Sequence, residues 1–206
     1  MPYTDINYNY TKTLIEVGPN DDPVAGYATA HDAVSATEIW DDMYVGQKYL
    51  FDVITGHWNW AIRRSCYSFD TSILSGKTII SVQAFFGRSG SPTEEQYIHI
   101  VQGDFAVPVL ATDYFSLLFD TEPRGTAYFS IGNNYATCYL NAIGISEINT
   151  SGTTKFALRS KDDVDDDPMV YDLNATSFSR KIGEIYSPSL RVYYESPVGK
   201  GFVEII

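Results

Sequence analysis

The stretch that decides the fold is residues 58–74, WNWAIRRSCYSFDTSIL. Aromatic and apolar residues recur in residues 58–69 with the alternation that is typical of a β-strand. Residues 70–72, Asp-Thr-Ser, then favour a chain reversal, because Asp and Ser side chains hydrogen-bond to nearby backbone N–H groups. After Gly76 a second alternating run covers residues 77–86. The stretch therefore predicts two strands separated by a turn.

Comparable runs recur along most of the chain, separated by clusters of Gly, Pro, Asn, Asp and Ser. Strands at intervals of about ten residues, with little helix between them, are typical of antiparallel sandwiches. We therefore predict an all-β protein built as an antiparallel two-sheet β-sandwich. The expected strands are residues 49–55, 58–69, 77–86, 96–101, 126–131, 135–140, 155–159 and 189–194, with an edge strand or tail at 201–206.

Helical signal is confined to three short segments. Residues 141–148 predict one or two turns, with Asn141 as the N-cap and with Ile145 and Ile148 facing the core. Residues 33–43 are a weaker candidate, and residues 113–118 predict a short turn of helix.

The first 26 residues differ from the rest of the chain, because their few apolar side chains stand among Asn, Asp and Pro. We expect residues 1–26 to form an extended N-terminal arm and residues 27–206 to form the domain. Too few apolar groups cluster in the arm to make a core of its own. We therefore expect it to become ordered only against another subunit or against an edge strand of the domain.

Charge excludes several classes of protein. The 206 residues carry 26 acidic and 14 basic side chains, which gives a net charge of −12. Nucleic-acid binders need a basic face that displaces counterions, and attraction to an anionic membrane surface needs the same sign of charge. No run approaches the roughly 18 apolar residues of a membrane-spanning helix, and the N-terminus lacks the pattern of a signal peptide. We expect no nucleic-acid partner and no membrane insertion.

Three segments carry a family resemblance. The first is RSCYSFDTSIL at residues 64–74, followed by TIISVQAFF at residues 78–86. The second is LNAIGISEI at residues 140–148, followed by GTTKFALRS at residues 152–160, and the third is PSLRVYY at residues 188–194. In this order they resemble the DNRLRE-type domains, which are jelly-roll modules similar to the TGF-β propeptide fold and to a family of carbohydrate-binding modules.

The resemblance implies a jelly-roll β-sandwich with one or two short helices over about residues 27–195. Ser75 stands where the family usually has Pro, and Val82 and Ala84 replace a larger pair, which are changes of packing. This version of the motifs resembles modules of phage and prophage structural genes. It implies a non-enzymatic structural protein of a tailed-phage virion, either a capsid decoration or a tail-associated component, with other virion proteins or further copies of itself as partners. The alternative is an extracellular carbohydrate-binding module that acts at a cell surface or on glycans, including host surface glycans.

One segment is rich in carboxylates, residues 161–168, KDDVDDDP. Calcium takes six to eight oxygen ligands, and such a loop could supply several of them through Asp163, Asp165 and Asp167. The run lacks the Gly and the final Glu of an EF-hand. A solvated loop between two strands is the simpler interpretation, so calcium is the one cofactor that we consider.

A second candidate site is the pair Trp58 and Trp60, with His57 beside it. Two Trp residues two positions apart share one face of a strand, and aromatic rings stack on the apolar face of a pyranose. Alternation also places Ile62 and Cys66 on that face, and these residue types prefer burial. We therefore expect a core face, although Arg64 is discordant there unless a bulge shifts the register.

Catalytic signals are weak. His31, His57 and His99 lie in separate segments, and the sequence contains no Gly-x-Ser-x-Gly elbow. Cys66 and Cys138 lie in apolar strands without the spacing of a metal site, which leaves two buried thiols or a disulfide as the main interpretations. We predict that the protein is not an enzyme.

Overall fold

The computed structural model describes residues 1–19, 23–41, 43–52, 57–89, 95–117, 121–168 and 179–195. Every strand pairing among these residues is antiparallel. The strands are β1 (Tyr3–Pro19), β2 (Glu38–Trp40), β3 (Tyr44–Asp52), β4 (His57–Asp70), β5 (Thr78–Arg88), β6 (Gln96–Gln102), β7 (Gly125–Phe129), β8 (Tyr135–Tyr139), β9 (Thr153–Ser160) and β10 (Ser179–Glu195). The helices are α1 (Pro23–His31), α2 (Asp113–Ser116), α3 (Ala142–Ser146) and α4 (Lys161–Val164), with a 3₁₀ turn at Ser72–Leu74.

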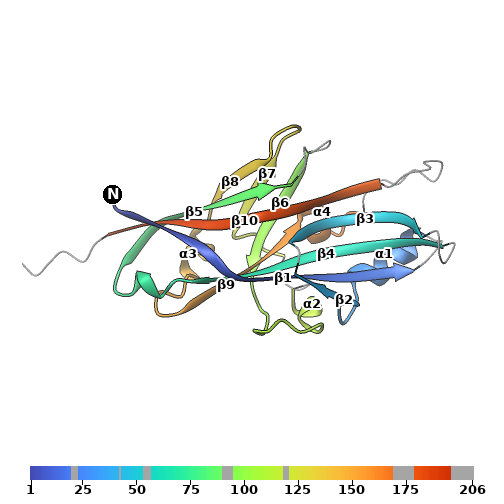
Figure 1. Ribbon diagram of the computed structural model, residues 1–206, viewed down its shortest axis with the longest axis horizontal. Coiled ribbons are helices and arrows are strands. Elements are labelled where there is room, and N and C mark those ends of the chain that lie inside the picture. The colour runs from blue at the N-terminus through green and yellow to red at the C-terminus, as the bar shows by residue number, and fades with distance from the viewer. Residues whose placement is uncertain are drawn as a thin grey trace, which may run out of the picture.

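The strands form two sheets that share their longest members. Sheet A has the order β1–β10–β5–β8 and uses the first part of β1 and the last part of β10. Sheet B has the order β2–β1–β4–β9–β6–β7, and β3 pairs with the first half of β4 and with the start of β10. Figure 1 shows β1 and β10 running along the length of the molecule. Because these two strands belong to both sheets, the sandwich is joined along one side.

The main core fills the space between the sheets. Strands of sheet A contribute Val82 and Leu190, and strands of sheet B contribute Phe69, Ile98 and Phe156, all of them buried. A second core covers the opposite face of sheet B, where α1, α2 and the segment after β6 pack on the strands. Its members include Leu14, Tyr27, Tyr49, Trp60, Ile62, Cys66, Val101, Phe105, Tyr114 and Ala157. Sheet B is therefore buried on both faces along β4, whose residues from Trp60 to Phe69 are all buried.

The predicted all-β, antiparallel two-sheet sandwich is confirmed, and each of the eight strand runs from 49–55 to 189–194 contains a strand. The short helix at 141–148 is also confirmed as α3. The Asn141 side chain accepts a hydrogen bond from the Gly144 N–H at 2.9 Å, as an N-cap should, and Ile148 is buried in the main core. A helical turn, α2, lies within the predicted segment 113–118. Residues 201–206 lie outside the described residues.

One expectation near the N-terminus differs from the structure. The helix predicted over 33–43 is wrong, because β2 occupies Glu38–Trp40 and pairs with β1 through Leu14 and its neighbours. The segment expected as an extended arm contains β1, which lies between β10 and β2 and pairs with β4 from Tyr8 to Pro19. It is therefore paired with strands of the domain, which is one of the two ways of ordering that we expected. Apolar side chains in β1 are spaced widely in the sequence, but sheet pairing places Ile6 in the main core and Leu14 in the second core.

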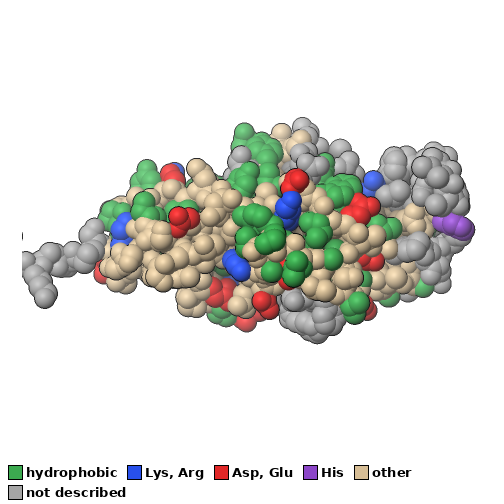
Figure 2. Space-filling model, turned by 60° about the horizontal axis from the view of Figure 1, so that its bottom comes forward, with side chains coloured by type: hydrophobic (Ala, Val, Ile, Leu, Met, Phe, Trp, Pro, Cys, Tyr) green, Lys and Arg blue, Asp and Glu red, His purple; other side chains and the backbone are tan. Residues whose placement is uncertain are grey.

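No helix among the described residues is long and apolar enough to cross a membrane. Figure 2 shows one face of the molecule, on which the Lys and Arg side chains of the described residues stand apart from one another. The net charge of −12 is therefore accompanied by no basic patch on the described part of that face.

We predict that β1 is required for the stability of the domain. Leu14 is completely buried in the second core, so Leu14→Ala should lower the free energy of unfolding by about 2–5 kcal/mol. Leu110 is 53% exposed, and Leu110→Ala should change it by no more than about 0.5 kcal/mol. Urea unfolding of the two variants measures the difference. Equal, small effects would mean that β1 is dispensable, as an arm would be.

Candidate functional site

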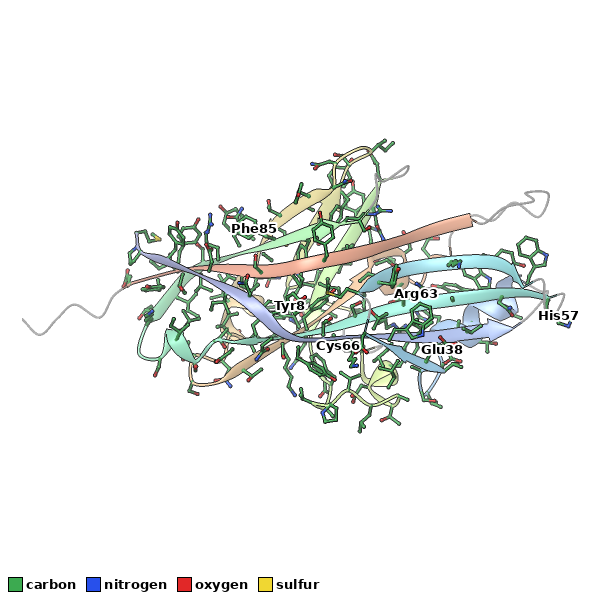
Figure 3. The ribbon with its side chains drawn as sticks, in the orientation of Figure 1. Tyr8, Glu38, His57, Arg63, Cys66 and Phe85 are labelled. Atoms are coloured by element: carbon green, nitrogen blue, oxygen red, sulfur yellow. The ribbon has the colours of Figure 1, made fainter. Side chains whose placement is uncertain are left out.

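The predicted Trp pair does not form an exposed platform. Trp60 is completely buried, and its ring lies 5.1 Å from the ring of Tyr49 and 5.3 Å from that of Tyr27. Trp58 is partly exposed, but one face of its ring is stacked on Tyr49 at 4.9 Å and 12°. His57 is exposed at the end of β4, far along the strand from Cys66 (Figure 3). Only Trp58 and His57 of the three residues are therefore accessible to a ligand.

Arg64 lies on the buried face of β4, and the strand has no bulge there. The pairing of β4 with β1 is regular from Asn59 to Ser68, so Arg64 stays on the face that carries Trp60 and Cys66. It is completely buried there, and it donates two hydrogen bonds to the Asp163 carboxylate at 2.8 and 3.0 Å. Burial of this guanidinium is tolerated because its charge is paired and its donors are bonded.

A second arginine completes the ionic cluster. Arg159 is also fully buried, and its Nε donates to the Asp163 carboxylate at 2.7 Å. Its Nη1 donates to the Leu117 carbonyl, while Nη1 of Arg64 donates to the Tyr114 carbonyl, each at 3.0 Å. Nη2 of Arg64 reaches the carbonyl of His31, the last residue of α1, at 3.1 Å. Two cations thus bond the ends of α1 and α2, where backbone carbonyls lack helical partners.

This cluster removes Asp163 from the predicted calcium site. The Asp163 carboxylate is fully buried and faces two arginines, so it is not available as a ligand. Asp165 forms an ion pair with Lys161, and Asp167 is exposed. No group of three or more His, Cys, Asp or Glu side chains among the described residues could hold a metal ion. The acidic run supplies a buried counterion and a solvated turn.

Both cysteines are free and buried, and they lie in different cores. Cys66 belongs to the second core and Cys138 to the main core, so the disulfide alternative does not apply. Burial raises the pKa of the Cys138 thiol to about 12 and raises that of Cys66 as well. Since the thiolate is the nucleophile, both side chains act as small apolar groups.

An exposed candidate surface lies on the outer face of sheet A. Tyr3, Tyr135 and Tyr139 are 53%, 66% and 61% exposed, and Phe85 and Tyr193 are partly exposed between them. Figure 3 labels Phe85 on β5, which pairs with β10 on one side and β8 on the other. We call this surface the aromatic face. It is made of the outward side chains of residues 3–7, 81–87, 135–139 and 189–193.

Charge is nearly absent from the aromatic face. Asp5 and Arg191 are the only charged residues within its four segments, and they neutralise each other. Arg191 donates to both oxygens of Asp5 at 2.7 and 3.0 Å, which lowers the pKa of the Asp5 carboxyl. The guanidinium also lies over the rings of Tyr3 and Phe85, at 4.7 and 5.2 Å. The remaining side chains are small, neutral and polar, such as Ser81, Gln83 and Thr137.

A groove of about 160 Å³ crosses one end of the aromatic face. It is lined by Phe85, Gly87, Tyr135, Thr137 and Tyr186 together with their strand neighbours. The ring of Tyr186 lies so close to Gly87 that a Cβ at position 87 would stand 2.3 Å from it. Comparison with protein-family models and with curated proteins finds no match for this chain. We therefore infer function from the surface of the molecule.

Sequence reasoning missed the aromatic face, although three of its four segments carry a signal for it. The strands 135–139 and 189–193 both alternate tyrosine or polar side chains with buried ones, and residues 3–7 do so too. Only the pairing of β1 with β10, which joins residues far apart in the chain, places them on one surface.

We predict that Trp60 is a structural residue. Trp60→Ala should lower the free energy of unfolding by about 3–5 kcal/mol, because it removes a fully buried ring. Trp58→Ala should lower the free energy of unfolding clearly less, since the Trp58 ring is partly exposed. Thermal melts of both variants make the comparison. If Trp60→Ala melted like the wild type, the ring would have to be a surface platform instead.

We also predict that Asp163 makes the free energy of unfolding depend on pH in acidic solution. Burial opposes its ionisation, but Arg64 and Arg159 outweigh that effect and hold the pKa of Asp163 below its ordinary value. The stabilisation is therefore complete above the unfolded pKa of about 3.9 and is lost as the pH falls toward the folded pKa. At pH 7, Asp163→Asn should cost about 3–5 kcal/mol because it leaves two buried cations without a counterion.

The pH dependence separates this effect from a simple loss of packing. The difference in unfolding free energy between wild type and Asp163→Asn should be constant above about pH 5 and should shrink below about pH 4. Asp167→Asn changes an exposed carboxylate of the same turn and serves as the control. A difference that did not change with pH would show that the charge of Asp163 is not what stabilises the cluster.

Proposed function

We propose that this protein is a non-enzymatic structural component of a tailed-phage virion, a capsid decoration or a tail-associated protein, which assembles through its aromatic face. The resemblance of its motifs to phage structural modules supports the virion, and the composition of the aromatic face supports assembly. Cores of protein interfaces are enriched in Tyr, Phe and Arg and depleted of Lys, Glu and Asp. The aromatic face matches this pattern in its Tyr, Phe and Arg side chains and in its lack of Lys and Glu.

The aromatic face is suited to contact between copies of the chain. Each copy carries a net charge of −12, so most of its surface repels a second copy. Residues 3–7, 81–87, 135–139 and 189–193 together are neutral, because Asp5 and Arg191 cancel. Contact through this surface therefore avoids the repulsion that contact through other surfaces meets. Tyrosine also contributes a large contact area with few rotatable bonds, which lowers the entropy cost of association.

Self-association should therefore depend on the aromatic face. Tyr139→Glu adds a negative charge to each copy on β8, the outermost strand of that face, and should weaken association at least about tenfold, since like charges across an interface are costly. Val34→Glu adds the same charge at a residue that is 71% exposed outside the face, and it should associate like the wild type. Sedimentation over a range of concentrations measures both.

The virion itself provides the second test. Mass spectrometry of purified virions should find the protein at a fixed stoichiometry, and the Tyr139→Glu variant should be depleted from them. A protein that is absent from virions, or whose association both variants weaken equally, would contradict the proposal.

The alternative is an extracellular carbohydrate-binding module. Trp60 is buried, which removes half of the aromatic platform that the sequence suggested for sugar binding. Trp58 and His57 alone, with one face of Trp58 already stacked on Tyr49, offer a small surface for a sugar. A glycan would therefore need another site on the molecule.

A further inference from the structure

The turn between β7 and β8 carries an exposed apolar side chain. Ile131 is 65% exposed in this turn, which projects from the body of the molecule (Figure 1). The Asn133 N–H donates to the Ser130 carbonyl at 3.0 Å, and Gly132 has a φ of 78°, a left-handed value that favours glycine. The side chain of Asn133 also accepts a hydrogen bond from the Tyr135 N–H at 3.0 Å. The turn is therefore held by hydrogen bonds, with Ile131 at its corner.

The groove of about 160 Å³ at the end of the aromatic face lies next to this turn, because Tyr135, Ala136 and Thr137 contribute to its lining. The hydroxyl groups of Tyr135 and Tyr186 are hydrogen-bonded to each other, so the polar atoms of these two rings already have partners. None of the described lining residues carries a charge. An apolar cavity of about 150 Å³ holds a benzene molecule. The groove therefore has room for the four carbons of an isoleucine side chain.

Ile131 and the groove together make this end of the molecule complementary to itself. A two-fold axis repeats each contact, because the patch that one copy contributes meets the same patch of the other copy. An axis that passes beside the β7–β8 turn brings Ile131 of each copy to the groove of its partner. Residues 83–87 and 130–137 contain no charged side chain. Two copies with a net charge of −12 each therefore meet little local repulsion here.

We propose that two copies of the chain pair about a two-fold axis, with Ile131 of each copy inserted into the groove of the other. This inference rests on the proposed assembly through the aromatic face, of which the groove is one end. It adds the side chain that enters the groove and the symmetry of the contact. The pair is closed, because each copy returns the contact that it receives. Side chains that fill a desolvated pocket contribute a large share of the affinity of an interface, so Ile131 should matter more than its size suggests.

Sedimentation of the full chain over a range of concentrations tests the two sides of the contact separately. Ile131→Asp removes the inserted side chain and should weaken self-association at least about tenfold. Thr137→Trp fills the groove, leaves the turn unchanged, and should weaken self-association to a similar extent. Ile73→Asp makes the same change as the first variant at an isoleucine that is 59% exposed outside the aromatic face, and it should associate like the wild type. Thermal melts should show all three variants folded, because each altered side chain is exposed.

A mixture of the two weakened variants tests the reciprocity of the contact. Two Ile131→Asp copies have open grooves but no isoleucine to fill them, and two Thr137→Trp copies have the isoleucine but no open groove. A mixed pair keeps one of the two contacts. An equimolar mixture should therefore associate more strongly than either variant alone, and a fluorescent label on one variant lets sedimentation follow the mixed pair.

The outcomes separate this inference from the proposal on which it rests. A wild type that stays monomeric at every concentration contradicts both. If the wild type associates and Tyr139→Glu weakens it, but Ile131→Asp associates like Ile73→Asp, the aromatic face is retained and the insertion of Ile131 is overturned. A mixture that associates no more strongly than its two components overturns the reciprocal contact.

Discussion

The carboxylate of Asp163 is the group on which one whole layer of this protein depends. Sheet B is buried on both faces along β4, and its outer face carries two arginines where an apolar core would be expected. A single buried carboxylate neutralises one of these charges, while carbonyls at the ends of α1 and α2 accept further hydrogen bonds from the two guanidinium groups. The layer of helices is thus attached to the sheet by directional bonds. Apolar contacts such as those of Tyr27 and Trp60 fill the space between them.

Such an arrangement favours one packing of the helices over others. Apolar contacts alone tolerate small slides between layers, whereas a bidentate arginine requires its acceptors at fixed positions. Tyr114 illustrates this point: its hydroxyl donates to the Ala30 carbonyl at 2.7 Å, and its ring lies 4.1 Å from the Arg64 guanidinium. Groups from α1, α2, β4 and β9 are therefore mutually dependent. Replacement of any one of them affects the others.

The sequence allowed the strands of the sandwich to be predicted because alternation is a local property. The N-cap at Asn141 could be recognised for the same reason, since a cap acts within three residues of its own position. Arg64 and Asp163 were each noticed as unusual, one as a charge on an apolar face and one as a possible metal ligand. Nothing local indicated that they are partners, because 99 residues separate them. The four-residue spacing of Arg159 and Asp163 was the nearest available signal.

The sequence did not indicate which strands β1 pairs with, and the reason is again the distance along the chain. Asp5 and Arg191 are 186 positions apart, yet they lie side by side in sheet A. Pairing of this kind requires both ends of the described chain to be present at once. During synthesis, β1 leaves the ribosome before the other described strands and has no β10 partner in sheet A until residues 189–193 have emerged. Until then, the sheet A part of β1 is an unpaired strand that is exposed to pairing with other chains.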